Sequence, residues 1–367
     1  MKSDRLTSLD AFRGFTIAGM ILVNNPGSWK HVYAPLRHAE WHGWTPTDLV
    51  FPFFLFIVGV SVSLSFSKRV SIGYEKYSLY FKIMKRTLIL FSLGIILALI
   101  PRFDLTTLRI PGVLQRIALC YLFSSLLFLK TGTKGRFILA FSLLAIYWII
   151  MKIVPVPGYE AGNLDYHGNL CAYIDNKLLS GHLYKADFDP EGILSTLPAI
   201  STTLLGTLTG DLLRSSKRIL QKTSGLLGAG LILALAGLLL HPLFPINKQL
   251  WTSTFVLFSA GAALICLAAF YVIMEGMGIR KWAVPFLIFG TNAITVYVAS
   301  SIMAKLAVLI KVSAGSQALS LKTYIYKYIF VPLGGSLNGS LMFPLFLLLI
   351  WLGIMIPLYK KKIFIKI

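Results

Sequence analysis

The stretch RHAEWHGWTPTDLVFPFFLFIVG, residues 37–59, changes abruptly from histidine, tryptophan and aspartate to an almost unbroken apolar run. The apolar part continues to residue 66 and has the length that an α-helix needs to cross the hydrocarbon of a membrane. Ionisable groups at the start of such a helix are costly in a membrane and therefore indicate function. The stretch predicts a membrane protein and marks a place to look for its chemistry.

Similar runs recur along the whole chain of 367 residues, which is 56% hydrophobic and only 13% charged. Its mean hydropathy of +0.75 excludes a water-soluble core. No repeat or long linker separates the runs, so we predict a single all-α integral membrane domain over residues 1–367. About ten runs have the length of a membrane-spanning helix, and they lie at 7–25, 48–66, 84–101, 110–130, 135–154, 191–213, 223–241, 251–274, 283–309 and 340–359.

The net charge of +21 follows the membrane topology and does not indicate nucleic acid as a partner. Lysine and arginine gather at both ends and in alternate loops, which predicts that both termini are cytoplasmic. The loop 155–190 on the opposite side is acidic on balance. The segment 310–339 fits this pattern less well because it carries three lysines, and we interpret LKTYIYKYIF within it as an interfacial or re-entrant helix.

In this topology residues 26–47 form the first outer loop, and His38 and Asp48 lie at the outer membrane boundary. A histidine oriented by a carboxylate is suited to general base catalysis near neutral pH. Two alternatives remain open: His38 as an ordinary interfacial residue, and a zinc site made by His38, His42 and Asp48. Trp41 is typical of a membrane interface, and tryptophan also stacks on sugars.

The first helix carries a polar face. Arg13 and Asn24 are eleven residues apart, which places them within about 20° of each other and roughly 16 Å apart along the helix axis. Asp10 precedes Arg13 by three residues, so an ion pair between them is the structural alternative to a functional role.

Three further segments, in other predicted helices, bring polar groups to the same outer level. RIPGVLQRI (109–117) is expected to begin the fourth helix with Pro111 in its first turn. DPEGILSTLPAIS (189–201) is expected to open the sixth with acidic residues, and PFLIFGTNAITVYV (285–298) carries an asparagine near mid-membrane. Each polar residue alone is typical of a structural hydrogen bond, but together they predict a buried polar chamber. The residues expected to line it are Gln115, Arg116, Glu191 and Asn292.

Five motifs resemble, in order from residue 5 to about 300, the signatures of the transmembrane heparan-α-glucosaminide N-acetyltransferase family in its compact bacterial form. They are RLTSLDAFRGFTIAGMILVNN, HAEWHGWTPTDLVFPFFLFIVGVS, RIPGVLQRIALCY, DPEGILSTLPAISTTLLG and FGTNAITVYV. The resemblance implies acetyl transfer from cytosolic acetyl-CoA to the amino group of a terminal glucosamine across the membrane. It also implies that His38 is the catalytic histidine, Asn24 its companion, and Asp48 the aspartate of the motif.

Lysosomal members carry a longer N-terminal luminal part with an additional helix, so we expect a different amino sugar here. The CoA phosphates are expected at the cytoplasmic face, beside Lys85, Arg86, Arg280 and Lys281, with the pantetheine arm along the helix face of Arg13. No metal is expected. The amino sugar is expected to contact Trp41 and the four chamber residues.

Other functions remain open from the sequence. The acceptor of the acetyl group could instead be a lipid or a cell-wall glycan, and a sugar or anion transporter is the alternative outside enzymes. The resemblance to a bacterial form predicts the bacterial inner membrane as the location. The sequence leaves the oligomeric state undecided, with a homodimer as one candidate.

Overall fold

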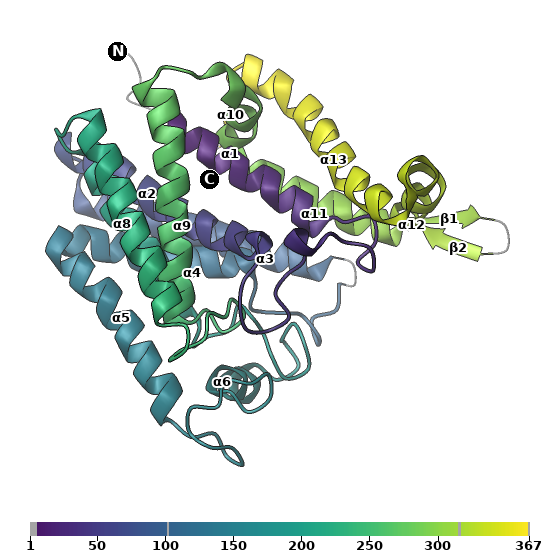
Figure 1. Ribbon diagram of the computed structural model, residues 1–367, viewed down its shortest axis with the longest axis horizontal. Helices are drawn as coiled ribbons and strands as arrows, with labels where there is room; N and C mark the ends of the chain where they lie inside the picture. Colours follow the sequence, from purple (N-terminus) through teal and green to yellow (C-terminus); the bar gives the residue numbers. More distant parts are fainter. Residues whose placement is uncertain (1–5, 101–102, 315–316, 366–367) are drawn as a thin grey trace.

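The computed structural model describes residues 6–100, 103–314 and 317–365, which form a bundle of helices with one short β-hairpin (Figure 1). The helices and strands are α1 (Thr7–Asn24), α2 (Val50–Ser71), α3 (Lys76–Leu99), α4 (Val113–Lys130), α5 (Thr133–Ile153), α6 (Leu170–Leu179), α7 (Thr196–Arg214), α8 (Ile219–Leu239), α9 (Ser253–Tyr271), α10 (Val284–Thr291), α11 (Ala293–Leu309), β1 (Lys311–Ala314), β2 (Gln317–Ser320), α12 (Leu321–Ile325) and α13 (Val331–Lys360).

Each of the ten predicted runs contains a long helix or, for 283–309, a pair of helices. Within the described residues, six helical stretches are long and apolar enough to cross a membrane, and the pair formed by α10 and α11 would make a seventh. An all-α membrane fold is therefore confirmed. The count of ten exceeds these seven, because α1, α3 and α7 are not among them. The six stretches are Pro46–Ser71, Val113–Lys130, Thr133–Ile153, Ile219–Leu239, Ser253–Gly276 and Leu321–Lys360.

The ninth run does not form one straight helix. Its two halves meet at an angle of 72°, and Asn292, at the junction, has a non-helical backbone with φ −129° and ψ 41°. The Asn292 side chain donates to the carbonyl oxygen of Ile363 at 3.0 Å and accepts from the N–H of Ile365 at 2.8 Å. Asn292 thus ties the bend to the segment that follows α13.

Two helices begin later than the sequence predicts. Pro111 precedes α4 and does not lie in its first turn, and α7 begins at Thr196, so Asp189 and Glu191 belong to the preceding loop. For α7 the physical reason lies in the Asp189 carboxylate, which accepts N–H groups from within this loop, among them that of Glu191 at 2.9 Å. The carboxylate therefore folds the loop on itself instead of stabilising a helix start.

The segment 310–339 contains a feature that the sequence did not predict. Strands β1 and β2 form an antiparallel hairpin in which Lys311 pairs with Ser320. The expected helix over LKTYIYKYIF is present as α12 and a following wide turn, Tyr326–Phe330, and it leads directly into α13. Its position relative to the membrane surface stays a prediction.

Close approach of α2 and α7 gathers the polar loops at one end of the bundle, where α6 also lies (Figure 1). Gly59 of α2 and Gly206 of α7 face each other, and a Cβ atom on either would overlap the backbone of the opposite helix. The missing side chains let the two helices touch. As a result Asp48, just before α2, lies near the loop that precedes α7.

Candidate active site

A cavity of about 520 Å³ opens at this end of the bundle. Its wall combines an apolar floor from α1, α2, α4 and α11 with polar side chains from four loops or loop ends. Such a hollow, mostly apolar with a few convergent polar groups, is the usual form of a small-molecule site. The polar and charged residues that line it are Asn24, His38, Thr47, Asp48, Arg109, Tyr184, Lys185, Glu191, Lys248, Gln249 and Tyr297.

His38 and Asp48 form a hydrogen-bonded pair in the cavity wall. The His38 Nδ1 atom lies 2.6 Å from Asp48 Oδ1, and the side chain of His38 is 40% exposed while that of Asp48 is buried. A carboxylate oxygen can only accept, so the short distance places a proton on Nδ1. The other ring nitrogen, Nε2, is then left free to accept a proton in the neutral imidazole.

The Asp48 carboxylate is held on its second oxygen by the loop before it. Asp48 Oδ2 accepts the backbone N–H groups of Ala39 and Thr45, each at 3.0 Å. Thr45 precedes the short turn Pro46–Leu49 at the start of α2, and its bond to Asp48 is the backward half of a capping box. Thus the same carboxylate orders the entry to α2 and fixes the His38 ring.

Lys248 adds a positive charge to this pair from a distant part of the sequence. Its Nζ lies 3.3 Å from Asp48 Oδ1 and 3.0 Å from His38 Nδ1. Because His38 Nδ1 carries a proton toward Asp48, we assign the Lys248 interaction to the carboxylate. Burial lowers the pKa of Lys248, and the nearby charges of Asp48 and Glu191 oppose this effect.

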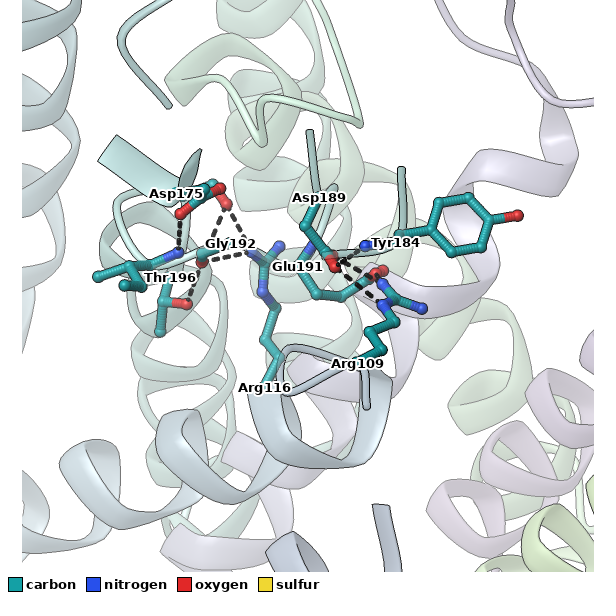
Figure 2. Close-up of polar contacts among 10 residues, drawn as sticks. Arg109, Arg116, Asp175, Tyr184, Asp189, Glu191, Gly192 and Thr196 are labelled. Atoms are coloured by element: carbon teal, nitrogen blue, oxygen red, sulfur yellow. Dashed lines mark hydrogen bonds and ion pairs between the residues drawn. The ribbon is translucent and has the colours of Figure 1, made fainter. Parts of the chain in front are cut away.

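A second group of charged residues is formed by Arg109 and the two carboxylates at the start of the loop 189–195. Arg109 donates from Nε and Nη2 to the two oxygens of Asp189, at 2.8 and 2.7 Å, and it also pairs with Glu191 (Figure 2). Burial would lower the pKa of Arg109, but the two carboxylates raise it overall. Asp189 is buried, whereas Glu191 lines the cavity. Arg109 therefore fixes Glu191 at the cavity wall.

Arg116 and Asp175 form hydrogen bonds with the backbone of this loop and do not line the cavity. Arg116 is fully buried in α4 and donates to the carbonyl oxygen of Gly192 at 3.0 Å (Figure 2). Asp175 in α6 accepts the N–H of Ile193 at 2.8 Å. Gly192 has no room for a side chain, because a Cβ atom there would overlap the Asp175 carboxylate. The predicted residue Arg116 thus contacts the loop that carries Glu191.

Among the other residues expected near the acceptor, Trp41 lines the cavity and Gln115 and Asn292 do not. Trp41 donates its indole N–H to the carbonyl oxygen of Leu164 at 2.8 Å and packs on the rings of Tyr166 and Phe188. Gln115 is buried in α4. Asn292 is bound at the bend described above.

Asn24 lines the cavity at the C-terminal end of α1, and its side chain is exposed there. Within the described residues it has no recorded hydrogen-bond partner, which leaves its amide available to a ligand. Arg13, earlier on the same helix, pairs with Asp10 at 2.8 Å and donates to Ser61 at 2.8 Å. The ion pair expected as the structural alternative is therefore present.

The cations expected to bind the CoA phosphates lie outside this cavity. Arg280 pairs with Glu275, whose carboxylate also accepts from Thr7 at the start of α1. Arg280 is thus at the opposite end of α1 from Asn24. Lys85 and Arg86 belong to α3 and Lys281 follows Arg280, and none of these four residues lines the cavity.

Sequence reasoning did not select Arg109 and Lys248. Arg109 stands first in the motif RIPGVLQRI, whereas the residue of that motif expected to line the chamber was Arg116. Lys248 lies in a short loop before α9, 210 residues from His38 along the chain, and no local pattern connects the two. A charged residue among the apolar runs, close to a predicted helix start, was the only available signal.

The sequence of the chain is similar to those of known proteins. A family model described as heparan-alpha-glucosaminide N-acetyltransferase, catalytic, matches residues 5–244, a segment that includes His38, Asp48 and Glu191. Heparan-alpha-glucosaminide N-acetyltransferase of Homo sapiens is 32% identical over 352 residues, and that of Mus musculus is 30% identical over 359. The alignments cover 80% and 82% of this chain but 52% and 54% of the relatives, so the chain spans about half of their length. This match shows that the chain belongs to the heparan-alpha-glucosaminide N-acetyltransferase family.

Proposed function

We propose that this protein is a membrane N-acetyltransferase that moves acetyl from acetyl-CoA to the amino group of glucosamine or of a glucosamine-terminated saccharide. The observation that carries the proposal is the His38–Asp48 pair, joined at 2.6 Å in the wall of the cavity. The family membership supports the same reaction, because the curated relatives are named for N-acetyl transfer to a glucosaminide.

In the proposed reaction, the neutral amine of the acceptor attacks the thioester carbonyl carbon of acetyl-CoA. His38 Nε2 takes the proton that the amine loses as the C–N bond forms, and Asp48 stabilises the resulting imidazolium. The C–S bond then breaks, and the CoA thiolate leaves with the proton returned by His38. The products are the N-acetyl sugar and CoA, and no other reactant is needed.

Asn24 is the proposed donor to the oxyanion that forms on the thioester, because its amide is open to the cavity. A preorganised donor at that position lowers the barrier by stabilising charge that exists only in the transition state. The proposed contacts with the sugar are ring stacking on Trp41 and hydroxyl hydrogen bonds to Glu191, and both residues line the cavity. Incubation with acetyl-CoA and no sugar tests direct transfer, because a stable acetyl-enzyme would show that His38 carries the acetyl group covalently instead.

The proposed topology places the cavity at the outer side and both termini in the cytoplasm, in one domain of ten spans that adds α1, α3 and α7 to those named above. Helix α1 has 18 residues and is therefore about 27 Å long, so it separates the two ends of the bundle. The CoA nucleotide would lie at the cytoplasmic end near Lys85, Arg86, Arg280 and Lys281. The pantetheine arm would pass Arg13 toward the cavity. The proposed location is the bacterial inner membrane.

The test uses purified protein in detergent with radiolabelled acetyl-CoA and glucosamine, and measures the N-acetylglucosamine that forms. We expect His38→Ala to lose about two or more orders of magnitude in rate, the range that general base catalysis supplies. His167→Ala is the matched control, because His167 is paired with an aspartate but 70% exposed outside the cavity. Equal rates for both variants would place the chemistry elsewhere, and absence of product from wild type would reject this donor and acceptor.

A further inference from the structure

A second hollow of about 320 Å³ lies beside the candidate active site, between α11, α13 and the loop that follows α1. Asn24 lines both hollows and separates them. Apart from Asn25 and two lysines, the other residues that line the second hollow are apolar or aromatic, among them Trp29, Met303 and Phe343. The second hollow therefore offers a mostly apolar surface in direct contact with a residue of the proposed catalytic site.

The two lysines in this hollow differ in their partners. Lys305 donates to the carbonyl oxygens of Leu97 and Ile100, which close the end of α3. Lys322, at the start of α12, is half-buried, and its ammonium lies over the rings of Trp29 and Phe343 at 5.9 and 6.0 Å. No carboxylate or hydrogen-bond acceptor is recorded for Lys322 among the described residues.

A half-buried ammonium without a counter-ion loses hydration and gains only ring contacts in return. Anions with several acceptor oxygens, phosphate above all, compensate such a charge through charge-assisted hydrogen bonds. The charge of Lys322 therefore specifies an anionic group as the ligand, and the apolar walls around it specify that this group is attached to something hydrophobic.

An entirely apolar hollow of about 380 Å³ continues along α11 and shares Met303 and Ala307 with the hollow at Lys322. It opens between α11 and the start of α12, on a side of the bundle where Leu306 and Ile310 are exposed. Figure 1 shows α11, α12 and the hairpin together at this edge of the molecule. The neighbouring helix α13 belongs to a stretch that is long and apolar enough to span a membrane, so in the topology proposed above this edge would face lipid.

We propose that these two hollows bind a phosphate-bearing lipid that carries the acceptor amino sugar, with its phosphate at Lys322 and its hydrocarbon chain along α11. This inference rests on the function proposed above and names the class of acceptor. A sugar attached to that phosphate lies next to Asn24 and reaches the cavity of His38 from the side, without crossing open solvent.

The first test measures lipid retention by native mass spectrometry of the detergent-solubilised protein, using phosphatidylglycerol as the anionic probe and phosphatidylcholine as the zwitterionic one. We expect wild type to retain phosphatidylglycerol preferentially and Lys322→Met to lose that preference. Lys311→Met is the matched control, since Lys311 is an exposed lysine of the neighbouring hairpin. Lys322→Arg should keep the preference. Equal retention by wild type and Lys322→Met, or displacement of the lipid by millimolar inorganic phosphate, would overturn the lipid site.

The second test compares N-acetylation of polyprenyl-phosphate-linked glucosamine with that of free glucosamine. We expect Lys322→Met to lower kcat/KM for the lipid-linked acceptor by about tenfold or more, the value of one charge-assisted hydrogen bond, and to leave the free sugar unaffected. Acetylation of free but not lipid-linked glucosamine by wild type would reject the carrier while the proposed function stands. If neither sugar is acetylated, the proposed function fails, and the carrier inference fails with it.

Discussion

Asp175 gives the sharpest quantitative prediction, because its carboxyl group is fully buried outside the membrane-spanning helices. One oxygen accepts the N–H of Ile193, and the other has no hydrogen-bond partner among the described residues. Burial raises the pKa of Asp175 to about 6, from the 3.8 that is usual for an aspartate, and the charge of Asp189 adds to this effect. The N–H of Ile193 and the charge of Arg116 oppose it. The perturbation that we propose is Asp175→Asn.

The sign follows from proton binding. Between about pH 4 and pH 6 the folded protein retains the Asp175 proton and the unfolded chain has released it, so the free energy of unfolding falls as pH rises through this window. A shift of about two pKa units corresponds to roughly 3 kcal/mol at 1.36 kcal/mol per unit. This contribution is fully present below pH 4 and is lost above pH 6. In Asp175→Asn it is absent at every pH.

The assay is thermal unfolding in detergent at pH 4 and pH 7.5, for wild type and Asp175→Asn. Any effect of the amide that does not depend on pH cancels when the two pH values are compared. From pH 4 to pH 7.5 the free energy of unfolding of the mutant, relative to that of wild type, should therefore rise by roughly 3 kcal/mol. At about 2 °C per kcal/mol for a long chain, the difference in midpoint temperature is roughly 6 °C. Asp165→Asn, which removes an exposed carboxyl group near the same end of the bundle, controls for the loss of one charge. Parallel pH curves for wild type and Asp175→Asn would refute the reasoning.

Two further predictions concern the residues that position the site. Arg109→Gln removes the guanidinium that two carboxylates share. We expect the free energy of unfolding to fall by about 3 kcal/mol and the acetylation of glucosamine to slow. An unchanged free energy of unfolding and an unchanged rate would contradict the assigned role. Gly59→Ala should destabilise the bundle, because its Cβ would overlap the carbonyl oxygen of Thr203 in α7. Gly228→Ala is the control and should not destabilise it, because the space around Gly228 is open. Equal midpoint temperatures for the two variants would show that α2 and α7 do not touch at Gly59.

The sequence by itself determined where the helices lie and where part of the chemistry lies. Each apolar run became helical, the ninth as two helices joined at a bend, because its length and composition are local properties and hydrocarbon leaves the backbone few alternatives to a helix. The pairing of His38 with Asp48 was also accessible, since ten residues separate them and the aspartate lies at the start of an apolar helix. The position of each helix and the pairing of His38 with Asp48 could both be inferred from residues that are close together in the sequence.

Only the tertiary structure decided which distant groups meet at that site. Lys248 reaches Asp48 from a loop before α9, and Arg109 reaches Glu191 from a loop before α4. The tertiary structure also places Arg116 outside the cavity, where it contacts the loop that carries Glu191. These pairings depend on how closely helices pack and where each loop turns, through contacts such as the glycine pair of α2 and α7. Apolar periodicity carries no record of which helices are neighbours, so the charge arrangement of the cavity could not be read from it.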